Sequence, residues 1–137
     1  MLESLITASE NFIYHQLRLK ATPHATLPAD ALHTCSITLF GEDGASHRAM
    51  FYFDLSYLTK VCEALLFEEA PDEATLIDMA KECTNLIAGS AKIIAQEREK
   101  SGFDIALPVY EGVATPSQNG TTDAIAIDKA FALAISL

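Results

Sequence analysis

Four small or polar residues follow one another at helical spacing in the middle of the chain: Asp78, Glu82, Asn85 and Gly89. Their separations of four, three and four residues stack them along one face of a helix, because residues three or four positions apart are neighbours on a helical surface. A carboxylate can make charge-assisted contacts, and an amide carries both a donor and an acceptor. Such a face can bind a cationic group and orient a small polar molecule.

The simplest interpretation of this face is a solvated helix surface, which needs no function. Two residues weaken that interpretation. Asn85 is of a type that prefers helix caps to helix interiors. Gly89 costs about 1 kcal/mol relative to alanine within a helix. Spacing alone does not decide between a solvated surface and a binding surface. Asn85 and Gly89 favour a surface that binds another molecule.

The element that must position these residues is a long helix, predicted from Asp72 or Glu73 to about Lys100. Its opposite face carries an apolar stripe, which is expected to be buried: Met79, Ala80, Cys83, Ile87, Ala91 and Ile94. Ser101 and Gly102 end the helix, and a strand carrying Pro108 is predicted over residues 103–110.

The remaining elements follow from periodicity and turn residues. They are a helix over 2–20, a loop over 21–31, a hairpin of strands 32–40 and 50–53 around the turn 41–44, a helix from Asp54 or Ser56 to Phe67, and a loop over 112–122. Residues 124–137 form either two strands meeting near Asp128 and Lys129 or one longer strand with a bulge. The pattern indicates an α/β protein of α+β type, with a βαβ-like mixed β-sheet and packed helices.

Length and charge narrow the functional classes. A chain of 137 residues fits a single domain over 1–137. Its net charge of −10 and pI of about 4.6 disfavour binding to nucleic acids and to anionic membranes. The N-terminus lacks the pattern of a signal peptide, and no apolar run is long enough for a membrane helix, so a cytoplasmic location is expected.

Cysteines and histidines do not suggest a metal site. The three cysteines, Cys35, Cys62 and Cys83, form no Cys-x-x-Cys pair, and the histidines are scattered. We expect the thiols to be buried and unpaired, with no metal bound by the chain.

The long helix and the strand after it resemble a family signature. The residues Asp78-Met79-Ala80-Lys81-Glu82-Cys83-Thr84-Asn85, then twenty-two residues, then Pro108, match the pattern of the CheC/CheX/FliY chemotaxis phosphatases: Asp or Ser, three residues, Glu, two residues, Asn, twenty-two residues, Pro. Gly89, four residues after Asn85, is also similar to a position in the family's motif helix. The order of elements and the single Glu-x-x-Asn copy favour the CheX branch and a CheC-like fold.

The resemblance implies a phosphatase that hydrolyses the aspartyl phosphate of a CheY-like response regulator in chemotaxis signalling. Asn85 would orient the attacking water and Glu82 would pair with a lysine of the receiver. Asp78 would be a rim contact or a helix-stabilising group. Pro108 would shape the neighbouring strand. Gly89 would allow close approach of the partner, or would serve helix–sheet packing.

The resemblance further implies no cofactor of the chain's own, with Mg²⁺ carried by the phosphorylated partner, and a homodimer built by sheet pairing. The chain ends early relative to the family pattern, so the pairing strand is expected to differ. Two other classes stay open: a non-catalytic adaptor that binds chemotaxis or flagellar-switch proteins, and an unrelated ligand-binding α/β domain.

Overall fold

The structure is a computed structural model that describes residues 1–116 and 121–137. Within these residues the chain forms three helices, α1 (Leu2–Leu17), α2 (Leu55–Leu66) and α3 (Glu73–Glu99). It also forms seven strands, β1 (Ala21–Thr22), β2 (Leu32–Gly41), β3 (Ser46–Phe53), β4 (Phe103–Ile105), β5 (Val109–Ala114), β6 (Thr122–Ile127) and β7 (Ala130–Ser136).

The strands form one sheet in the order β1-β6-β7-β3-β2-β4, and β5 also pairs with β2. All strand pairings found among the described residues are antiparallel. The α+β class is therefore confirmed, with a long helix and packed helices on a sheet. The βαβ-like arrangement is wrong, because a βαβ unit joins parallel strands through a crossover.

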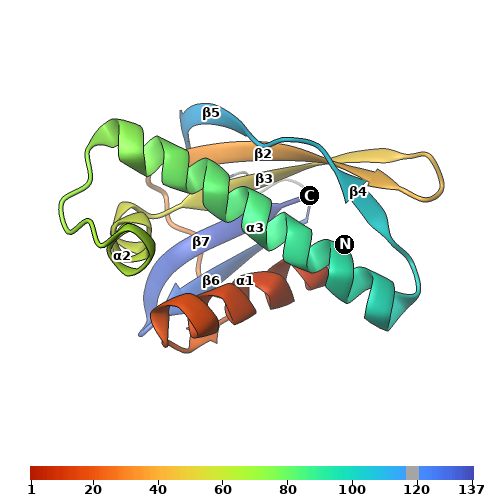
Figure 1. The fold of residues 1–137 in the computed structure, drawn as a ribbon, viewed down its shortest axis with the longest axis horizontal. Coiled ribbons are helices and arrows are strands. Elements are labelled where there is room, and N and C mark those ends of the chain that lie inside the picture. Colours follow the sequence, from red (N-terminus) through yellow and green to blue (C-terminus); the bar gives the residue numbers. More distant parts are fainter. Residues whose placement is uncertain (117–120) are drawn as a thin grey trace.

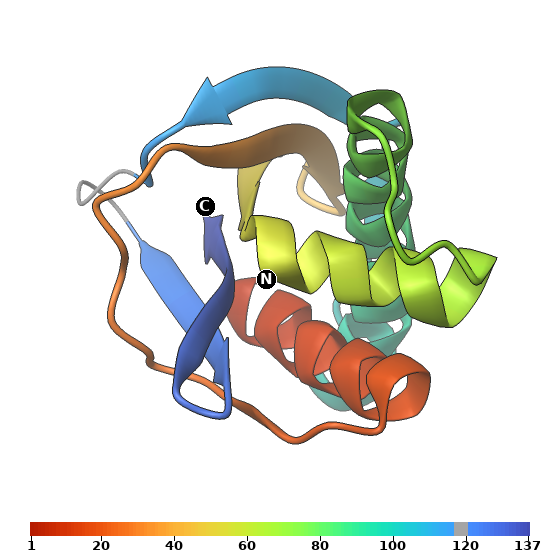
Figure 2. The same ribbon diagram turned by 90° about the vertical axis from the view of Figure 1, so that its left-hand side faces the viewer.

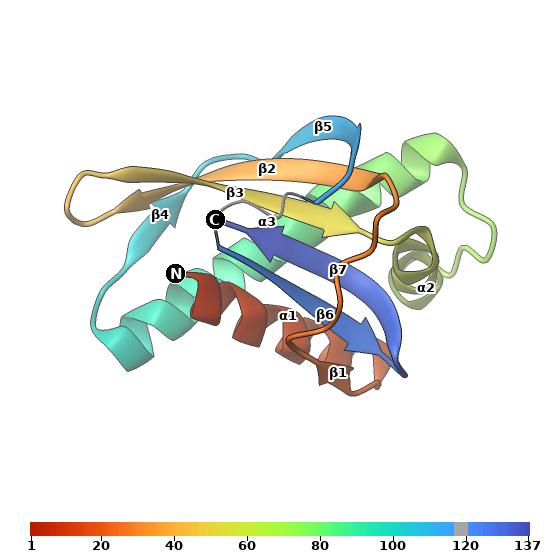
Figure 3. The ribbon, with the colours of Figure 1, turned by 180° about the vertical axis from the view of Figure 1, so that it is seen from behind.

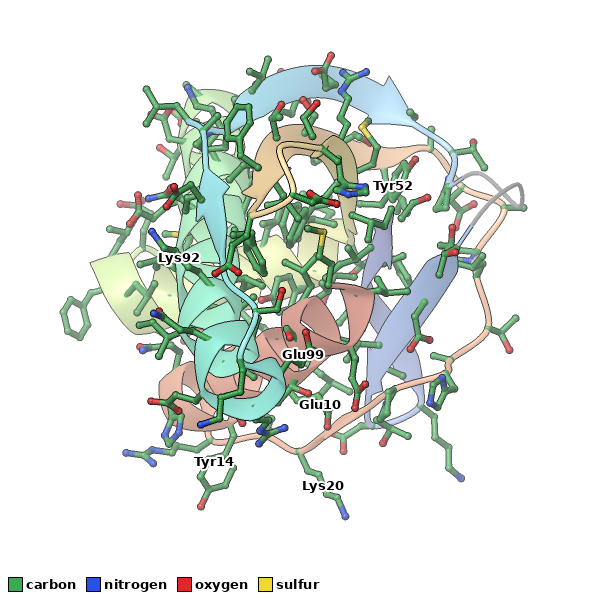
Figure 4. All side chains as sticks on the ribbon, turned by 90° about the vertical axis from the view of Figure 1, so that its right-hand side faces the viewer. Glu10, Tyr14, Lys20, Tyr52, Lys92 and Glu99 are labelled. Carbon is green, nitrogen blue, oxygen red and sulfur yellow. The ribbon has the colours of Figure 1, made fainter. Side chains whose placement is uncertain are left out.

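The helices cover one face of the sheet. Figure 1 shows α3 lying diagonally across the strands, with α1 and α2 on the same side. Figure 2 shows the sheet bending around α1 and α2. In Figure 4, Lys92 marks α3 on the helical side and Tyr52 marks the strands on the other side. The core lies between these two layers and includes Leu5, Ile13, Phe51, Phe53 and Ile87.

The rear face of the sheet carries a smaller apolar cluster. Leu32, Tyr52, Ala124 and Ala134 are buried there, packed against Leu27 and other partly buried residues. Tyr52 faces away from the main core because successive strand residues point to opposite faces, and its neighbours Phe51 and Phe53 belong to that core. The segment between β1 and β2 crosses this rear face (Figure 3).

Side-chain caps fix the starts of α2 and α3. Asp54 accepts a hydrogen bond from the Tyr57 backbone N–H at 3.2 Å, and Asp72 accepts one from the Thr75 backbone N–H at 2.8 Å. Each bond satisfies one of the amides that the first turn leaves without a helical partner. Of the two candidate caps for the second helix, Asp54 is therefore the cap and Ser56 lies inside the helix.

All three helices end at a non-glycine residue in the left-handed conformation. These residues are Arg18, Phe67 and Lys100, with φ values of 55°, 57° and 55°. Glycine is the usual residue at this position because it lacks a Cβ.

Several strand boundaries differ from those predicted. The strand predicted over 103–110 is divided into β4 and β5, and β5 continues to Ala114 inside the predicted loop 112–122. Residues 117–120 of that loop lie outside the described residues. The second hairpin strand starts at Ser46, and the predicted loop 21–31 includes the short strand β1. At the C-terminus the two-strand alternative is correct, with Asp128 and Lys129 at φ 50° and 67° in the turn.

Candidate functional site

The motif residues lie on the outward face of α3, as their spacing predicts. A face opposite the buried stripe predicts that all four are exposed. Asp78 and Glu82 are exposed, whereas Asn85 and Gly89 are half-buried. The opposite face packs on the core through Met79, Ala80, Cys83, Ile87 and Ala91, with Ile94 half-buried. Because the apolar face of α3 packs on the core, the motif residues on its other face are held facing outward.

A second wall of the site comes from the segment between β4 and β5. Both strands pair with β2, but the chain leaves the ladder between them after the Ala106 N–H donates to the Thr38 carbonyl at 3.0 Å. Pro108 has no N–H with which to continue the ladder. This interruption lies beside α3, and Leu107 within it is 83% exposed.

These two walls enclose a shallow pocket of about 440 Å³. Its lining consists of Asp78, Lys81, Glu82, Asn85, Leu107 and Pro108. The structure thus brings Asp78, Glu82, Asn85 and Pro108 together, although Pro108 follows Asn85 by many residues. Gly89 is not part of this lining and lies one turn further along α3.

Packing does not account for Gly89. In the described part of the chain, no atom outside the local helix backbone and the two neighbouring residues lies within 4 Å of the position that a Cβ would occupy there. The alternative that Gly89 serves helix–sheet packing is therefore wrong. What remains is an open strip of helix backbone, which another molecule can approach closely.

The acidic residues of the pocket have no ion-pair partner within the described part of the chain. The ion pairs found there join His24 to Asp123, Arg48 to Glu111 and Lys92 to Asp104. The Glu82 carboxylate is exposed and is therefore available to a cation from outside. No group of three or more His, Cys, Asp or Glu side chains in residues 1–116 and 121–137 is arranged to hold a metal ion.

The residues beneath the motif are buried and neutral. Thr84 donates from its hydroxyl to the Ala80 carbonyl at 2.8 Å inside α3. Burial raises the pKa of the Cys35 thiol to about 11 and raises that of Cys83 further. All three cysteines are free and buried, so the prediction of unpaired buried thiols is confirmed. Protonated buried thiols are poor nucleophiles, so these cysteines do not supply a nucleophile to the site.

The sequence pattern does not predict a second hollow, which lies on the other side of Glu82. This α2–α3 groove has a volume of about 600 Å³ and is lined by Leu65, Leu66, Thr75, Asp78, Met79, Glu82 and Leu86. Phe67, directly after Leu66, is 90% exposed. The apolar run Leu65-Leu66-Phe67 predicts the buried end of a helix, whereas in the structure Phe67 is the left-handed residue that follows α2. The sequence carries no signal that separates this run from a buried one, because its exposure is visible only in the structure.

None of the described helices is both long enough and apolar enough to cross a membrane.

Neither a protein-family model nor a curated protein sequence matches the chain. Solved structures do match it over nearly its whole length. The chemotaxis protein CheX from Vibrio vulnificus is similar at a TM-score of 0.78 and 20% identity, with 98% of this chain and 93% of that chain covered.

Two further structures are similar in the same way. The chemotaxis protein CheX from Desulfovibrio desulfuricans matches at a TM-score of 0.70 and 18% identity, covering 98% of this chain and 97% of that one. The CheX-CheY-BeF3-Mg²⁺ complex from Borrelia burgdorferi matches at 0.65 and 15% identity, covering 98% and 94%. These likenesses show that the chain has the CheC-like fold of CheX chemotaxis proteins.

Proposed function

We propose that the chain, as one domain over residues 1–137, is a CheX-type member of the chemotaxis phosphatase family. It hydrolyses the aspartyl phosphate of a CheY-like response regulator in the cytoplasm. The observation that carries this proposal is the open pocket in which Glu82 and Asn85 of α3 meet Pro108 from a distant part of the chain. A protein of the same fold in complex with CheY, BeF3 and Mg²⁺ supports it.

This chain has to supply only a few groups for the reaction. A phosphoryl group on an aspartate of the receiver is held by that partner's Mg²⁺ and lysine, so hydrolysis needs a water aligned opposite the leaving carboxylate. The amide of Asn85 is neutral, and it can accept from the water while donating to a phosphoryl oxygen. A carboxylate at that position would repel the phosphate. Glu82, one turn earlier and exposed, pairs with the receiver's lysine and holds α3 in register.

The other pocket residues support this arrangement. Asp78 adds an acidic rim contact one turn before Glu82. Pro108 keeps the interruption between β4 and β5 out of the ladder, which leaves space over Asn85. Gly89 lies ~6 Å along the helix from Asn85, at 1.5 Å rise per residue, and lets the receiver approach the backbone. Mg²⁺ comes with the receiver, and the chain supplies no cofactor.

We further propose a homodimer formed by sheet pairing. β5 is a peripheral strand of the sheet that pairs with β2 and carries Val109 and Val113, which are 54% and 59% exposed. A peripheral strand with exposed apolar residues is suited to pairing with a second copy.

The second candidate is a non-catalytic adaptor with the same fold. It would need the docking carboxylate of Glu82 but would not need the amide of Asn85. The two candidates therefore differ in what Asn85 does.

Substituting Asn85 and Glu82 separates catalysis from docking. In Asn85→Ala the water-orienting amide is lost while the charged contact stays, so we expect phosphate release to fall by 10²-fold or more. Binding to a receiver loaded with beryllofluoride and Mg²⁺ should change less than about threefold. Glu82→Ala, and more strongly Glu82→Lys, should weaken that binding by about tenfold or more, because the contact to a lysine is removed or reversed. Calorimetry gives the affinity, and phosphate release is followed separately.

A matched control is Gln96→Ala, which removes an exposed amide from a later turn of the same helix. It should leave both quantities unchanged. If Asn85→Ala retains near-normal phosphate release, Asn85 has no catalytic role. If the unsubstituted protein binds the receiver without accelerating phosphate release, the phosphatase proposal fails and the adaptor takes its place.

A further inference from the structure

The α2–α3 groove and the motif pocket share two walls. Asp78 and Glu82 line both hollows. A partner surface that places a lysine on Glu82 therefore lies directly beside the groove. The groove itself is mainly apolar, with Leu65, Leu66 and Leu86 along it.

Phe67 directly follows Leu66, which lines the groove, and it is unfavourable for the isolated fold in two respects. It occupies the left-handed position after α2, with φ 57°, where its N–H donates to the Glu63 carbonyl at 3.1 Å. A bulky residue is strained there and glycine is preferred. Its ring is also 90% exposed and so gains little from burial. The fold gives no reason for a phenylalanine at this position.

The exposed apolar residues beside Phe67 extend along the groove. Leu66 is 51% exposed and Leu86 is 41% exposed. Acidic residues surround them: Asp78 and Glu82 in the lining, and Glu68 and Glu69 directly after Phe67. An occupant that fits this surface presents an apolar side chain next to a cationic one.

Charge favours a receiver over a second copy of this chain as the molecule that occupies the α2–α3 groove. With a net charge of −10, a second copy would bring more acidic surface against an acidic rim. A receiver that already places a lysine on Glu82 brings the complementary charge. We infer that Phe67, Leu66 and Leu86 form an apolar half of the receiver contact, in which a receiver side chain enters the α2–α3 groove beside the lysine held by Glu82. This inference rests on the proposed function.

The test is a substitution that removes the ring and relieves the backbone together. Phe67→Gly should leave the urea midpoint of unfolding unchanged or raise it. It should also weaken binding of the beryllofluoride- and Mg²⁺-loaded receiver by about tenfold, measured by calorimetry with each CheY-like receiver of the source organism. Leu86→Gln, on the opposite wall, should weaken binding by several-fold. Phosphate release at saturating receiver should stay near that of the unsubstituted protein, because Asn85 is unchanged.

Two controls separate the groove from general effects. Lys100→Gly relieves the same left-handed position at the far end of α3, ~33 Å along the helix from Asp78 at 1.5 Å per residue, and should not alter binding. Tyr14→Ala removes an exposed aromatic ring from α1, where the side chain points outward (Figure 4), and should not alter binding either.

The outcomes distinguish this inference from the proposed function. If Phe67→Gly and Leu86→Gln bind the receiver like the unsubstituted protein while Asn85→Ala abolishes phosphate release, only the groove assignment is overturned. If Phe67→Gly changes self-association in sedimentation and leaves receiver binding unchanged, the occupant is a second copy and the inference is wrong. If the unsubstituted protein does not bind a receiver loaded with beryllofluoride and Mg²⁺, the groove assignment and the proposed function are both wrong.

Discussion

Gly89 lies within the 27-residue helix α3, and no neighbouring side chain requires a glycine there. A glycine inside a helix loses more backbone entropy on folding than alanine does. Selection for stability alone would favour alanine at this position. The open strip at Gly89 is therefore best explained by what approaches it from outside.

Gly89→Ala should raise the free energy of unfolding by about 0.5–1 kcal/mol and weaken receiver binding by several-fold. The gain comes from helix propensity, since among the described residues the added methyl group meets no atom within 4 Å outside its chain neighbours and the local helix backbone. The loss comes from the same methyl group standing between the helix and the receiver. Urea unfolding and calorimetry measure the two effects.

Ser90→Ala is the matched control for that experiment, because Ser90 is the next residue and is exposed on a different side of the helix. It should give a smaller stability gain and unchanged binding. Receiver affinity in Gly89→Ala equal to that of the original protein would rule out close approach at this position.

At the scale of the element, α3 depends on its first turn. Asp72 accepts the Thr75 N–H, and hydrogen bonds to Thr75 lower the pKa of the Asp72 carboxyl. Because the folded pKa lies below the unfolded value of about 3.9, this stabilisation is present above pH 4 and is lost as the pH falls through the folded pKa.

Asp72→Ala should therefore lower the urea midpoint of unfolding at pH 7, and the difference from the unsubstituted protein should shrink below pH 4. Asp72→Asn keeps a capping oxygen without the titration, so it should stay closer to the original at pH 7. Circular dichroism during urea titration at both pH values measures this. A difference that persists unchanged at pH 2.5 would contradict the capping account.

The elements also differ in how far sequence predicts them. The start and end of α3 were predictable, because Asp72 is a cap and Ser101-Gly102 a stop, and both signals are local. The division of 103–114 was not, because it depends on pairing with β2, far away in the chain. Gly112 reads as a loop residue, yet at φ 88° it lies in β5, which pairs with β2 through a register shift at Thr34 and Cys35.

The candidate site divides in the same way. The shared face of Asp78, Glu82, Asn85 and Gly89 follows from helical spacing alone. The groove beside it could not be predicted, because it lies between α2 and α3, and helical spacing within one element does not show which elements lie side by side. Apolar patterning also assigns Phe67 to the core, yet its side chain is 90% exposed.

At the scale of the whole molecule, the core keeps its thiols protonated. Burial raises the pKa of Cys35 to about 11, and burial also raises the pKa of Cys62 and Cys83. The unfolded chain releases these protons near pH 8.5–9. Since the unfolded state then binds fewer protons than the folded state, stability is fully present below about pH 8.5 and declines as the pH rises above it.

We therefore expect a thiol reagent at pH 7.5 to react slowly with the native protein and to count three thiols per chain in urea without reductant. We also expect the urea midpoint of unfolding to be lower at pH 10 than at pH 7.5. A count below three would contradict the unpaired state. An unchanged midpoint would contradict the effect of burial.

The attachment of β5 to β2 has a consequence for the order of folding. Tyr110 is joined to His33 by a 2.7 Å contact between its hydroxyl and Nδ1 that spans 77 positions, and Ser36 donates to Glu111 across 75 positions at 2.6 Å. Pairing strands that lie so far apart in the sequence is slow compared with forming a helix. During refolding the far-ultraviolet signal of helix formation should therefore recover before Leu107 and Pro108 reach their places in the pocket wall. A chain caught at that stage would display Glu82 and Asn85 on a formed helix and still lack the pocket in which they meet a partner.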